Sequence, residues 1–416
     1  MAARPGRDRW EIVLSSPAPA RALHLAVALD GAGWHPAAWR EPRARPAELL
    51  GAQYWVDIIG EAERGLLDFV TIEDGLSLQS DRYGTPDPRS DQVRGRLDAL
   101  LIAARAAPVT SSIGLVPTVV VTHTEPFHIS KAIATLDFVS GGRAGVRVRV
   151  SLGRGEAAHF GRREFPPLTR AELRGPAGAA VVADAFEEAA DYVEVVRRLW
   201  DSWDDDAEIR DVASGRFIDA ARLHYIDFSG RWFSVKGPSI TPRPPQGQPV
   251  VAALGHAAVP YRLIAGSADV GFVTPHDAGE AAVIAAEIRA AQETAGRGDD
   301  TVHVFGDLVV FLGPDPAGAA SRKSRLDDRA GAELRSDAAI FTGTAAGLAD
   351  LLLEWHEAGL SGFRLRPAVI PDDLEGITRE LVPELQRRGA FRREYEAPTL
   401  RGLLGLNRPA GRYARA

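Results

Sequence analysis

The chain has 416 residues, of which 45% are hydrophobic and 25% charged, the composition of a globular protein large enough to bury a sizeable core. Its net charge of -7 argues against nucleic acid as a partner, because phosphate binding needs a basic surface. The chain has no cysteine, which excludes disulfides, thiolate nucleophiles and cysteine-ligated metal centres, and no apolar run approaches the ~20 residues of a membrane span.

Residues 1–22 contain basic residues but no unbroken apolar core, unlike a secretory signal peptide. We therefore expect a flexible leader on a cytoplasmic protein. From residue 23 onward, segments typical of buried strands alternate with amphipathic segments typical of helices.

The clearest unit is EPFHISKAIATLDFVSGGRAGVRVRVS at 125–151, where apolar residues recur at helical spacing, two glycines end the helix, and valines then alternate with arginines. Similar patterns predict further strands at 23–29, 68–74, 111–121, 249–255, 269–274, 302–313 and 362–369. They predict further helices at 47–65, 96–107, 184–203, 259–268, 278–294, 345–359 and 374–389.

Apolar strands alternating with amphipathic helices indicate a parallel sheet covered by helices. Eight such units predict an α/β fold of the (β/α)8, or TIM barrel, type. A doubly wound open sheet is the alternative. The turn after the first strand, GAGWHPAAWR at 31–40, argues against it because it lacks the expected G-x-G-x-x-G pattern.

Long segments between the units are predicted as insertions in one barrel domain at 23–390, after strand four (152–183), after helix four (204–248) and after strand seven (314–344). The second insertion contains a hairpin predicted to turn at Ser229-Gly230, whereas the third shows no periodicity. Such insertions usually form lids or subunit contacts. The basic C-terminal tail, 391–416, is expected to wrap the surface.

In (β/α)8 barrels the functional site lies at the carboxyl ends of the strands. Polar side chains gather at these predicted ends, and four histidines are among them, which suggests a pocket. The set is His35, Glu73, Asp74, Thr118, Thr122, His123, Arg147, Arg149, Ser151, His256, Thr274, His276 and Arg366.

Chemistry by side chains alone is poorly supported. Barrel hydrolases carry a His-x-His pair after the first strand, and only His24 occurs in this first strand, so no metal site is predicted. A G-x-S-x-G nucleophile elbow is missing. Glu73 and Asp74 are neighbours on a strand and point to opposite faces, so they cannot flank one glycosidic bond. A cofactor is therefore favoured.

Several motifs resemble the bacterial luciferase-like flavin monooxygenases, and most closely the branch that acts on nitrilotriacetate, EDTA and dibenzothiophene sulfone. These motifs are IGLVPT and EPFHISKAIATLDFVSGGRAG, HFG at 159–161, LWDSW at 199–203, GPSITPRPPQGQPVV at 237–251 and GWHPAAWR at 33–40. The resemblance covers roughly 23 to 390. It implies a (β/α)8 barrel that oxidises a small organic substrate with dioxygen and reduced FMN. It also implies a separate NAD(P)H-dependent flavin reductase and a homodimer.

The resemblance assigns Asp74 and Thr118 to contacts with the flavin, and makes His35 a candidate catalytic acid or base. Each has a structural alternative. Asp74 could cap a turn, Thr118 could bond to the neighbouring backbone, and His35 could be a satisfied structural histidine.

Other positions depart from the family pattern. Its flavin-site histidine, tyrosine and phosphate-binding serine fall at Val182, Phe186 and Ala257, and its Trp-Asn pair falls at Val146 and Arg147. Cationic groups could compensate by binding the phosphate. We therefore expect the remaining cofactor ligands to be Arg147, Arg149, Ser151 and His256. The alternative for the two arginines is an ion pair in the barrel wall with acids such as Asp74.

Two further functions stay open. One is an oxidoreductase of the same fold that uses the deazaflavin F420. The other is a non-catalytic barrel that has lost tight flavin binding and serves as a partner subunit, which the apolar residues at Val182, Phe186 and Ala257 favour.

Overall fold

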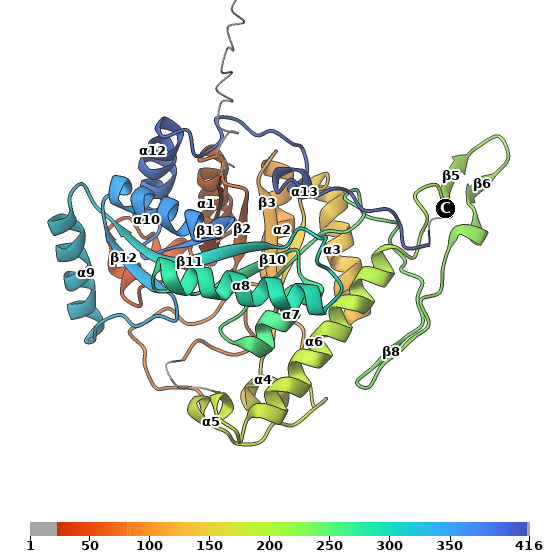
Figure 1. Cartoon of the computed structure of the whole chain (residues 1–416), viewed down its shortest axis with the longest axis horizontal. Helices are drawn as coiled ribbons and strands as arrows, with labels where there is room; N and C mark the ends of the chain where they lie inside the picture. The colour runs from red at the N-terminus through yellow and green to blue at the C-terminus, as the bar shows by residue number, and fades with distance from the viewer. Residues whose placement is uncertain (1–22, 81, 83, 414–416) are drawn as a thin grey trace, which may run out of the picture.

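Residues 23–80, 82 and 84–413 are described by the structure, a computed structural model of the chain. In this part of the chain eight parallel strands close into a barrel, which confirms the predicted (β/α)8 fold (Figure 1). In order around the barrel they are β1 (His24–Leu29), β2 (Phe69–Ile72), β3 (Gly114–Val120), β4 (Gly145–Arg149), β9 (Val250–Leu254), β10 (Val270–Val273), β11 (His303–Leu312) and β13 (Gly362–Pro367).

Helices cover the outside of the barrel, close to the predicted positions. They are α1 (Ala52–Arg64), α2 (Ala99–Ala106), α3 (Pro126–Ser140), α6 (Ala179–Trp200), α7 (Ala258–Ser267), α8 (Ala278–Thr294), α10 (Ala345–Glu357), α11 (Asp372–Gly376), a π-helical turn (Ile377–Leu381) and α12 (Val382–Arg387). Short 3-10 turns lie at Ala38–Arg40, Pro46–Glu48, Ala107–Val109 and Ala220–Arg222. No helix in the described ranges is both long and apolar enough to cross a membrane.

The unit α3–β4 shows how local sequence builds the barrel wall. Pro126 begins α3 at the first helical position, where its missing N–H has no cost. Gly141 ends the helix in the left-handed conformation, with φ of 69°. The alternating residues of β4 then pair with β3 so that Thr118 lies opposite Arg147. This register brings two predicted site residues together.

The first two insertions contain short elements. Helices α4 (Arg154–Ala158) and α5 (Arg170–Arg174) lie in the first. The second holds two antiparallel pairs that project from the barrel in Figure 1, β5 (Glu208–Asp211) with β6 (Arg216–Ile218), and β7 (Phe228–Ser229) with β8 (Ser234–Val235). The second pair confirms the predicted hairpin. Its turn begins at Gly230, whose N–H donates to the carbonyl of Phe233 at 3.0 Å.

The third insertion, whose sequence shows no periodicity, nevertheless contains regular elements that the sequence did not predict. It folds into α9 (Pro316–Ala330) and β12 (Ala339–Gly343), and β12 pairs with the far half of β11. The side chain of Asp315 caps α9, and Gly331 ends it with φ of 76°. Helix α9 is polar on most of its surface and buries only Ala319 and Leu326, so its sequence has little apolar periodicity to detect.

The C-terminal tail is more than the expected surface wrap. Its short helix α13 (Leu400–Leu403) presses Leu400 and Leu404 into the amino end of the barrel, where they pack with Phe69 and other interior residues. This closes the end of the barrel opposite to α4 and α5 (Figure 1). The leader predicted at 1–22 lies outside the described residues.

Candidate functional site

A cavity of about 580 Å³ lies at the carboxyl ends of β2 and β4, where (β/α)8 barrels carry their sites. We call it the rim cavity. The loop that follows β2 forms one wall, and the segment from the end of β4 to α4 forms the other. Among the lining residues, the chemically informative ones are Ser77, Gln79, Arg96, Arg149, Ser151 and Glu156.

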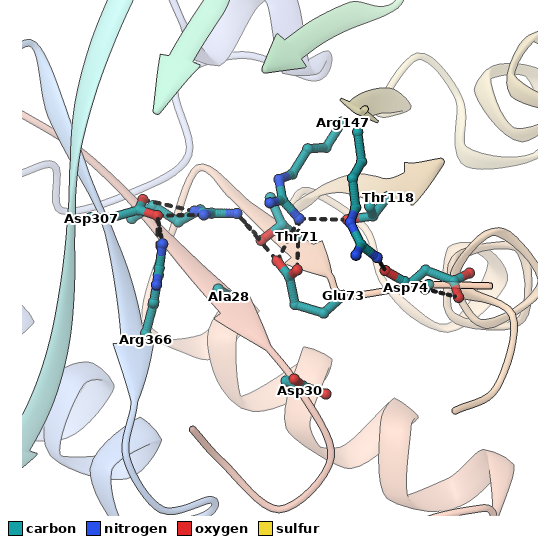
Figure 2. Close-up of polar contacts among 12 residues, drawn as sticks. Ala28, Asp30, Thr71, Glu73, Asp74, Thr118, Arg147, Asp307 and Arg366 are labelled. Atoms are coloured by element: carbon teal, nitrogen blue, oxygen red, sulfur yellow. Dashed lines mark hydrogen bonds and ion pairs between the residues drawn. The ribbon is translucent and has the colours of Figure 1, made fainter. Parts of the chain in front are cut away.

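The barrel axis next to the cavity is occupied by charged side chains. One Nη of Arg147 donates to both carboxylate oxygens of Glu73, at 2.7 and 2.8 Å, and to Oγ1 of Thr118 at 3.0 Å. Nη1 of Arg364 also donates to Glu73, at 3.3 Å. Figure 2 shows Glu73 between Arg147 and Asp74 on one side and Asp307 on the other. The barrel-wall ion pair weighed for Arg147 is therefore present, but its acid is Glu73 and not Asp74.

The ion pairs continue across the barrel. Asp307, fully buried, accepts Nε of Arg364 at 2.8 Å and Nε of Arg366 at 3.0 Å. Arg366 also donates to Asp337 at 2.7 Å. Burial alone would raise the pKa of Asp307, but the two guanidinium groups lower it, so the carboxylate stays ionised. We call these six residues the axial network: Glu73, Arg147, Asp307, Asp337, Arg364 and Arg366.

Asp74 faces away from the axial network. Its carboxylate accepts the backbone N–H of Gly75 at 2.7 Å and that of Ala99 at 2.9 Å. Its side chain therefore fixes the start of α2 and the turn after β2, which matches the structural alternative for this residue. The backbone carbonyl of Asp74 accepts Nη1 of Arg149 at 2.6 Å, so Asp74 holds a cavity arginine in place.

Two predicted cofactor ligands, Arg149 and Ser151, do line the rim cavity. The Arg149 side chain is 35% exposed, and one of its nitrogens lies 3.9 Å from Oε1 of Glu156. The Ser151 N–H donates to Oγ1 of Thr122 at 2.9 Å, which fixes the strand end, and its hydroxyl accepts the N–H of Gly153 at 3.2 Å. Both side chains keep donor groups for a ligand.

His35 lies at the loop after β1 and is almost fully buried. Its Nδ1 accepts the N–H of Ala37 at 3.0 Å, and its Nε2 donates to Asp327 at 3.1 Å. Burial lowers the pKa of His35, although Asp327 opposes this effect. Since both ring nitrogens are used, this geometry fits the structural alternative, a tie between the loop and α9, and the catalytic role of His35 stays a prediction.

His256 follows β9, the neighbour of β4 in the barrel. Its Nδ1 lies 2.9 Å from Oγ1 of Thr274, and its Nε2 lies 3.6 Å from Asp337. Its side chain is 43% exposed, and it is not among the residues that line the rim cavity. The structure therefore separates His256 from Arg149 and Ser151, with which the sequence had grouped it.

Val182, Phe186 and Ala257 lie outside the cavity wall. Val182 and Phe186 are half-buried on α6, and Ala257 precedes α7. None of the three side chains can bind a phosphate. Among the described residues, no group of three or more His, Cys, Asp and Glu side chains is arranged to hold a metal ion.

Some functional candidates were missed from the sequence. Glu156 and Arg96 line the cavity but lie in aperiodic segments, where no pattern places a side chain. Arg96 is held by Asp30, whose carboxylate accepts its Nε at 3.1 Å. Arg364 and Asp307 are charged residues on fully buried strands, and this unusual placement was the signal that could have revealed the axial network.

Comparisons with known proteins bear on this site. The family model of the luciferase-like monooxygenases matches residues 37–357. The chain is 30% identical to N-acetyl-S-(2-succino)cysteine monooxygenase of Bacillus subtilis (strain 168), over 94% of this chain and 98% of that protein. It is 28% identical to nitrilotriacetate monooxygenase component A of Aminobacter aminovorans, with the same coverage. The structure of EDTA monooxygenase from Chelativorans sp. BNC1 matches with a TM-score of 0.79 and 24% identity, covering 93% of this chain and 99% of that one, which shows a shared fold.

Proposed function

Because the chain belongs to the luciferase-like monooxygenase family, we propose that it oxidises a small organic substrate with dioxygen and reduced FMN in the rim cavity. The observation that carries this proposal is the cavity itself. It lies at the carboxyl ends of β2 and β4, and its wall carries guanidinium and hydroxyl groups suited to an anionic, hydrogen-bonding ligand.

The residues of the cavity fit the cofactor. Its volume of about 580 Å³ falls within the range of roughly 300–1,000 Å³ that is typical of small-molecule sites. Arg149 would bind the phosphate, and the hydroxyl of Ser151, which keeps its donor hydrogen, would donate a further hydrogen bond. Arg96 would add positive charge from a position that Asp30 fixes. Reduced FMN, when bound, supplies the electrons that activate dioxygen.

The axial network assigns different roles to the other predicted ligands. Arg147 and Thr118 are bonded to each other, and Arg147 also binds Glu73, so both contribute to the floor beside the cavity. Asp74 orients Arg149 through its carbonyl. We propose that these three residues position the site and do not bind the phosphate. The loop after β2 would cover the ligand and keep water away from it.

A reductase partner is part of the proposal. The relative from Aminobacter aminovorans is named as component A, which describes one part of a multi-component enzyme. We propose that a separate NAD(P)H-dependent flavin reductase supplies reduced FMN to this chain. A homodimer and a cytoplasmic location remain predictions from the family resemblance.

The proposal is tested by anaerobic fluorescence titration of the purified chain with reduced FMN, oxidised FMN and reduced F420. Micromolar affinity for reduced FMN, lost in Arg149→Met, would support the proposed site. His276→Gln serves as the control, because His276 is an exposed rim residue that pairs with Glu280 at 3.3 Å, outside the cavity wall.

Two outcomes would contradict it. Tighter binding of reduced F420 would point to the deazaflavin oxidoreductase. Only millimolar affinity for every flavin would favour a barrel without tight cofactor binding. The ion pairs that fill the barrel axis are compatible with that alternative, because they leave no room for a ligand there. In that case the chain should also fail to consume dioxygen when mixed with a flavin reductase, NADH and FMN.

A further inference from the structure

A buried histidine behind the rim cavity has no assigned task. His123 follows β3 and is 3% exposed. Its ring stacks on Phe160, with centroids 5.7 Å apart, and meets the edge of Phe165 at 6.0 Å. Neither Nδ1 nor Nε2 has a hydrogen-bond partner among the described residues. An imidazole left without partners in the interior is costly, so its presence calls for an explanation.

A carboxylate in the cavity wall has a free oxygen on the same side of the barrel. Glu156 lies on α4 and is 5% exposed. Its Oε1 accepts the N–H of Leu76 at 3.3 Å and the hydroxyl of Ser77 at 3.2 Å, and so holds the loop that covers the cavity. Its Oε2 is buried and has no hydrogen-bond partner within the described part of the chain.

Three arginines surround His123 and Glu156. Burial lowers the pKa of His123, the charge of Glu156 opposes this, and Arg163 and Arg162 lower it further. Both arginines are already engaged, since Arg163 pairs with Asp184 and Glu188, and Arg162 lies 3.3 Å from Glu125 and 3.4 Å from Glu188. Arg149 faces Glu156 from β4 at 3.9 Å. His123 is therefore neutral near neutral pH, with Glu156 as the nearby anion that acts on it.

We propose that His123, with Glu156 as its nearby anion, is a proton-binding site coupled to the rim cavity, so that an anion entering the cavity is accompanied by one proton that His123 takes up. The proton comes from solvent and is held by His123 Nδ1 or Nε2. No bond other than that to the proton forms or breaks. This inference rests on the proposed function only in its choice of FMN as the anion.

The physical reason is electrostatic. An anion bound by Arg149 brings negative charge close to Glu156, which is buried and has one unused oxygen. A second negative charge nearby favours the protonated, cationic form of an imidazole. The uptake of one proton leaves the net charge around a monoanionic ligand unchanged. It also places a transferable proton at the wall of a site proposed for oxygen chemistry.

The test is isothermal titration calorimetry of FMN binding in two buffers of different ionisation enthalpy, at about pH 6.5, near the usual pKa of histidine. The difference in heat gives the number of protons taken up with the ligand. The phosphate of FMN has a pKa of its own near ~6, so each variant is compared with the wild type and the same ligand. We expect a net uptake in the wild type that is lost in His123→Phe and in Glu156→Gln.

The variants are chosen to preserve the packing. Phenylalanine keeps the aromatic contacts of His123, and glutamine keeps an oxygen that can accept from Leu76 and Ser77. His276→Gln removes an exposed histidine outside the cavity and should leave the uptake unchanged. His159, which lines the cavity, is the competing proton acceptor. If His159→Gln abolishes the uptake while His123→Phe retains it, the inference is wrong.

A second readout does not depend on variants that fold. The ring-proton resonances of His123 in the wild type, followed by NMR as a function of pH, should titrate at higher pH when the anion is bound. FMN binding with the same proton number in all variants would overturn the inference and leave the proposed function intact. If FMN binds in neither its oxidised nor its reduced form, the proposed function fails, and inorganic phosphate becomes the probe. Phosphate binding without proton uptake would then overturn the inference.

Discussion

The two ends of the barrel are closed by opposite means. At the amino end, Leu400 and Leu404 from the tail pack with Phe69, Phe272 and Phe305 in an apolar layer. At the carboxyl end, the axial network fills the same cross-section with buried ion pairs, beside which the rim cavity opens. The apolar end stabilises the fold at little cost, whereas the charged end must offset a large desolvation penalty.

Phe272 is the point at which the two layers meet. Its ring packs with Phe69 at 6.2 Å between centroids, and the guanidinium of Arg364 lies 4.1 Å from its centroid on the other side. A cation over an aromatic face is favourable where water is excluded. The comparison teaches that the barrel places its non-specific stabilisation at one end. Along the barrel axis the charged layer lies at the end where a ligand is expected, whereas ion pairs at the amino end, such as that of Asp68 with Arg392, lie beside the apolar layer.

The largest effect is expected from Asp307→Ala, which removes the shared acid of Arg364 and Arg366. Two buried guanidinium groups would lose their partner, and breaking a buried pair in this way costs about 3–5 kcal/mol. Urea denaturation followed by circular dichroism measures the loss in the free energy of unfolding. Arg387→Ala is the control, because it breaks an exposed pair with Glu384 and should cost less than about 0.5 kcal/mol. A loss below that of Leu400→Ala would mean that the network is hydrated.

The apolar end should respond next. Leu400→Ala removes a fully buried side chain from the layer that seals the barrel, which costs about 2–4 kcal/mol through lost burial and the remaining cavity. The same denaturation experiment measures it, with exposed Leu50→Ala as the matched control. An effect as small as that of the control would show that the tail does not stay docked in solution. Flavin affinity should be unchanged in Leu400→Ala.

The alternation of apolar strands with amphipathic helices along this chain was sufficient to predict the fold. Strands such as β3 and β10 are buried throughout, and amphipathic helices such as α6 follow them, so periodicity identified all eight units. Helix α9 was missed because it buries only two residues, Ala319 and Leu326, and is held by capping and ion pairs. The tail was missed because its burial depends on a distant barrel interior and not on a local pattern.

The site was harder to predict. The rule that strand ends carry the site correctly selected Arg149 and Ser151 for the cavity wall. It did not predict that Arg147, two residues before Arg149, forms an ion pair with Glu73 inside the barrel. Nor could it place Glu156, because its position depends on how two aperiodic loops fold over one another. Pairing between side chains that are distant in sequence is set by tertiary structure, which a single sequence does not reveal.

Acidity should separate one buried carboxylate at each end of the barrel, Glu73 and Asp137. At the carboxyl end, burial alone would raise the pKa of Glu73, but Arg147 and Arg364 lower it from 4.5 to about 2. Glu73 therefore stabilises the fold above about pH 4.5, and this contribution is lost as the pH falls toward 2. At the amino end, burial raises the pKa of Asp137 from 3.8 to about 6, although Gln246 opposes this effect. Its contribution is complete below pH 3.8 and is lost as the pH rises through 6.

The measurement compares the free energy of unfolding of the wild type with those of Glu73→Gln and Asp137→Asn over this pH range. The advantage of the wild type over Glu73→Gln should shrink as the pH falls below about 4.5. Its advantage over Asp137→Asn should shrink as the pH rises from about 4 to 6. Parallel pH dependences for the two variants would contradict the opposite pKa shifts of Glu73 and Asp137.

The smallest effect on stability, and the sharpest on binding, is expected from Arg149→Met. Its guanidinium is one-third exposed and gives a single strong hydrogen bond to the carbonyl of Asp74, so its loss should change the free energy of unfolding by only about 1 kcal/mol. A charge-assisted contact with a phosphate is worth about 1.5–3 kcal/mol, so affinity for FMN should fall about tenfold or more. Titration with FMN and with riboflavin separates the two contributions, because riboflavin lacks the phosphate. Equal losses for both ligands would mean that Arg149 shapes the cavity without binding the anion. A loss confined to FMN would show that Arg149 binds the phosphate. The apolar side chains at the other end of the barrel, such as Leu400, cannot make such a contact.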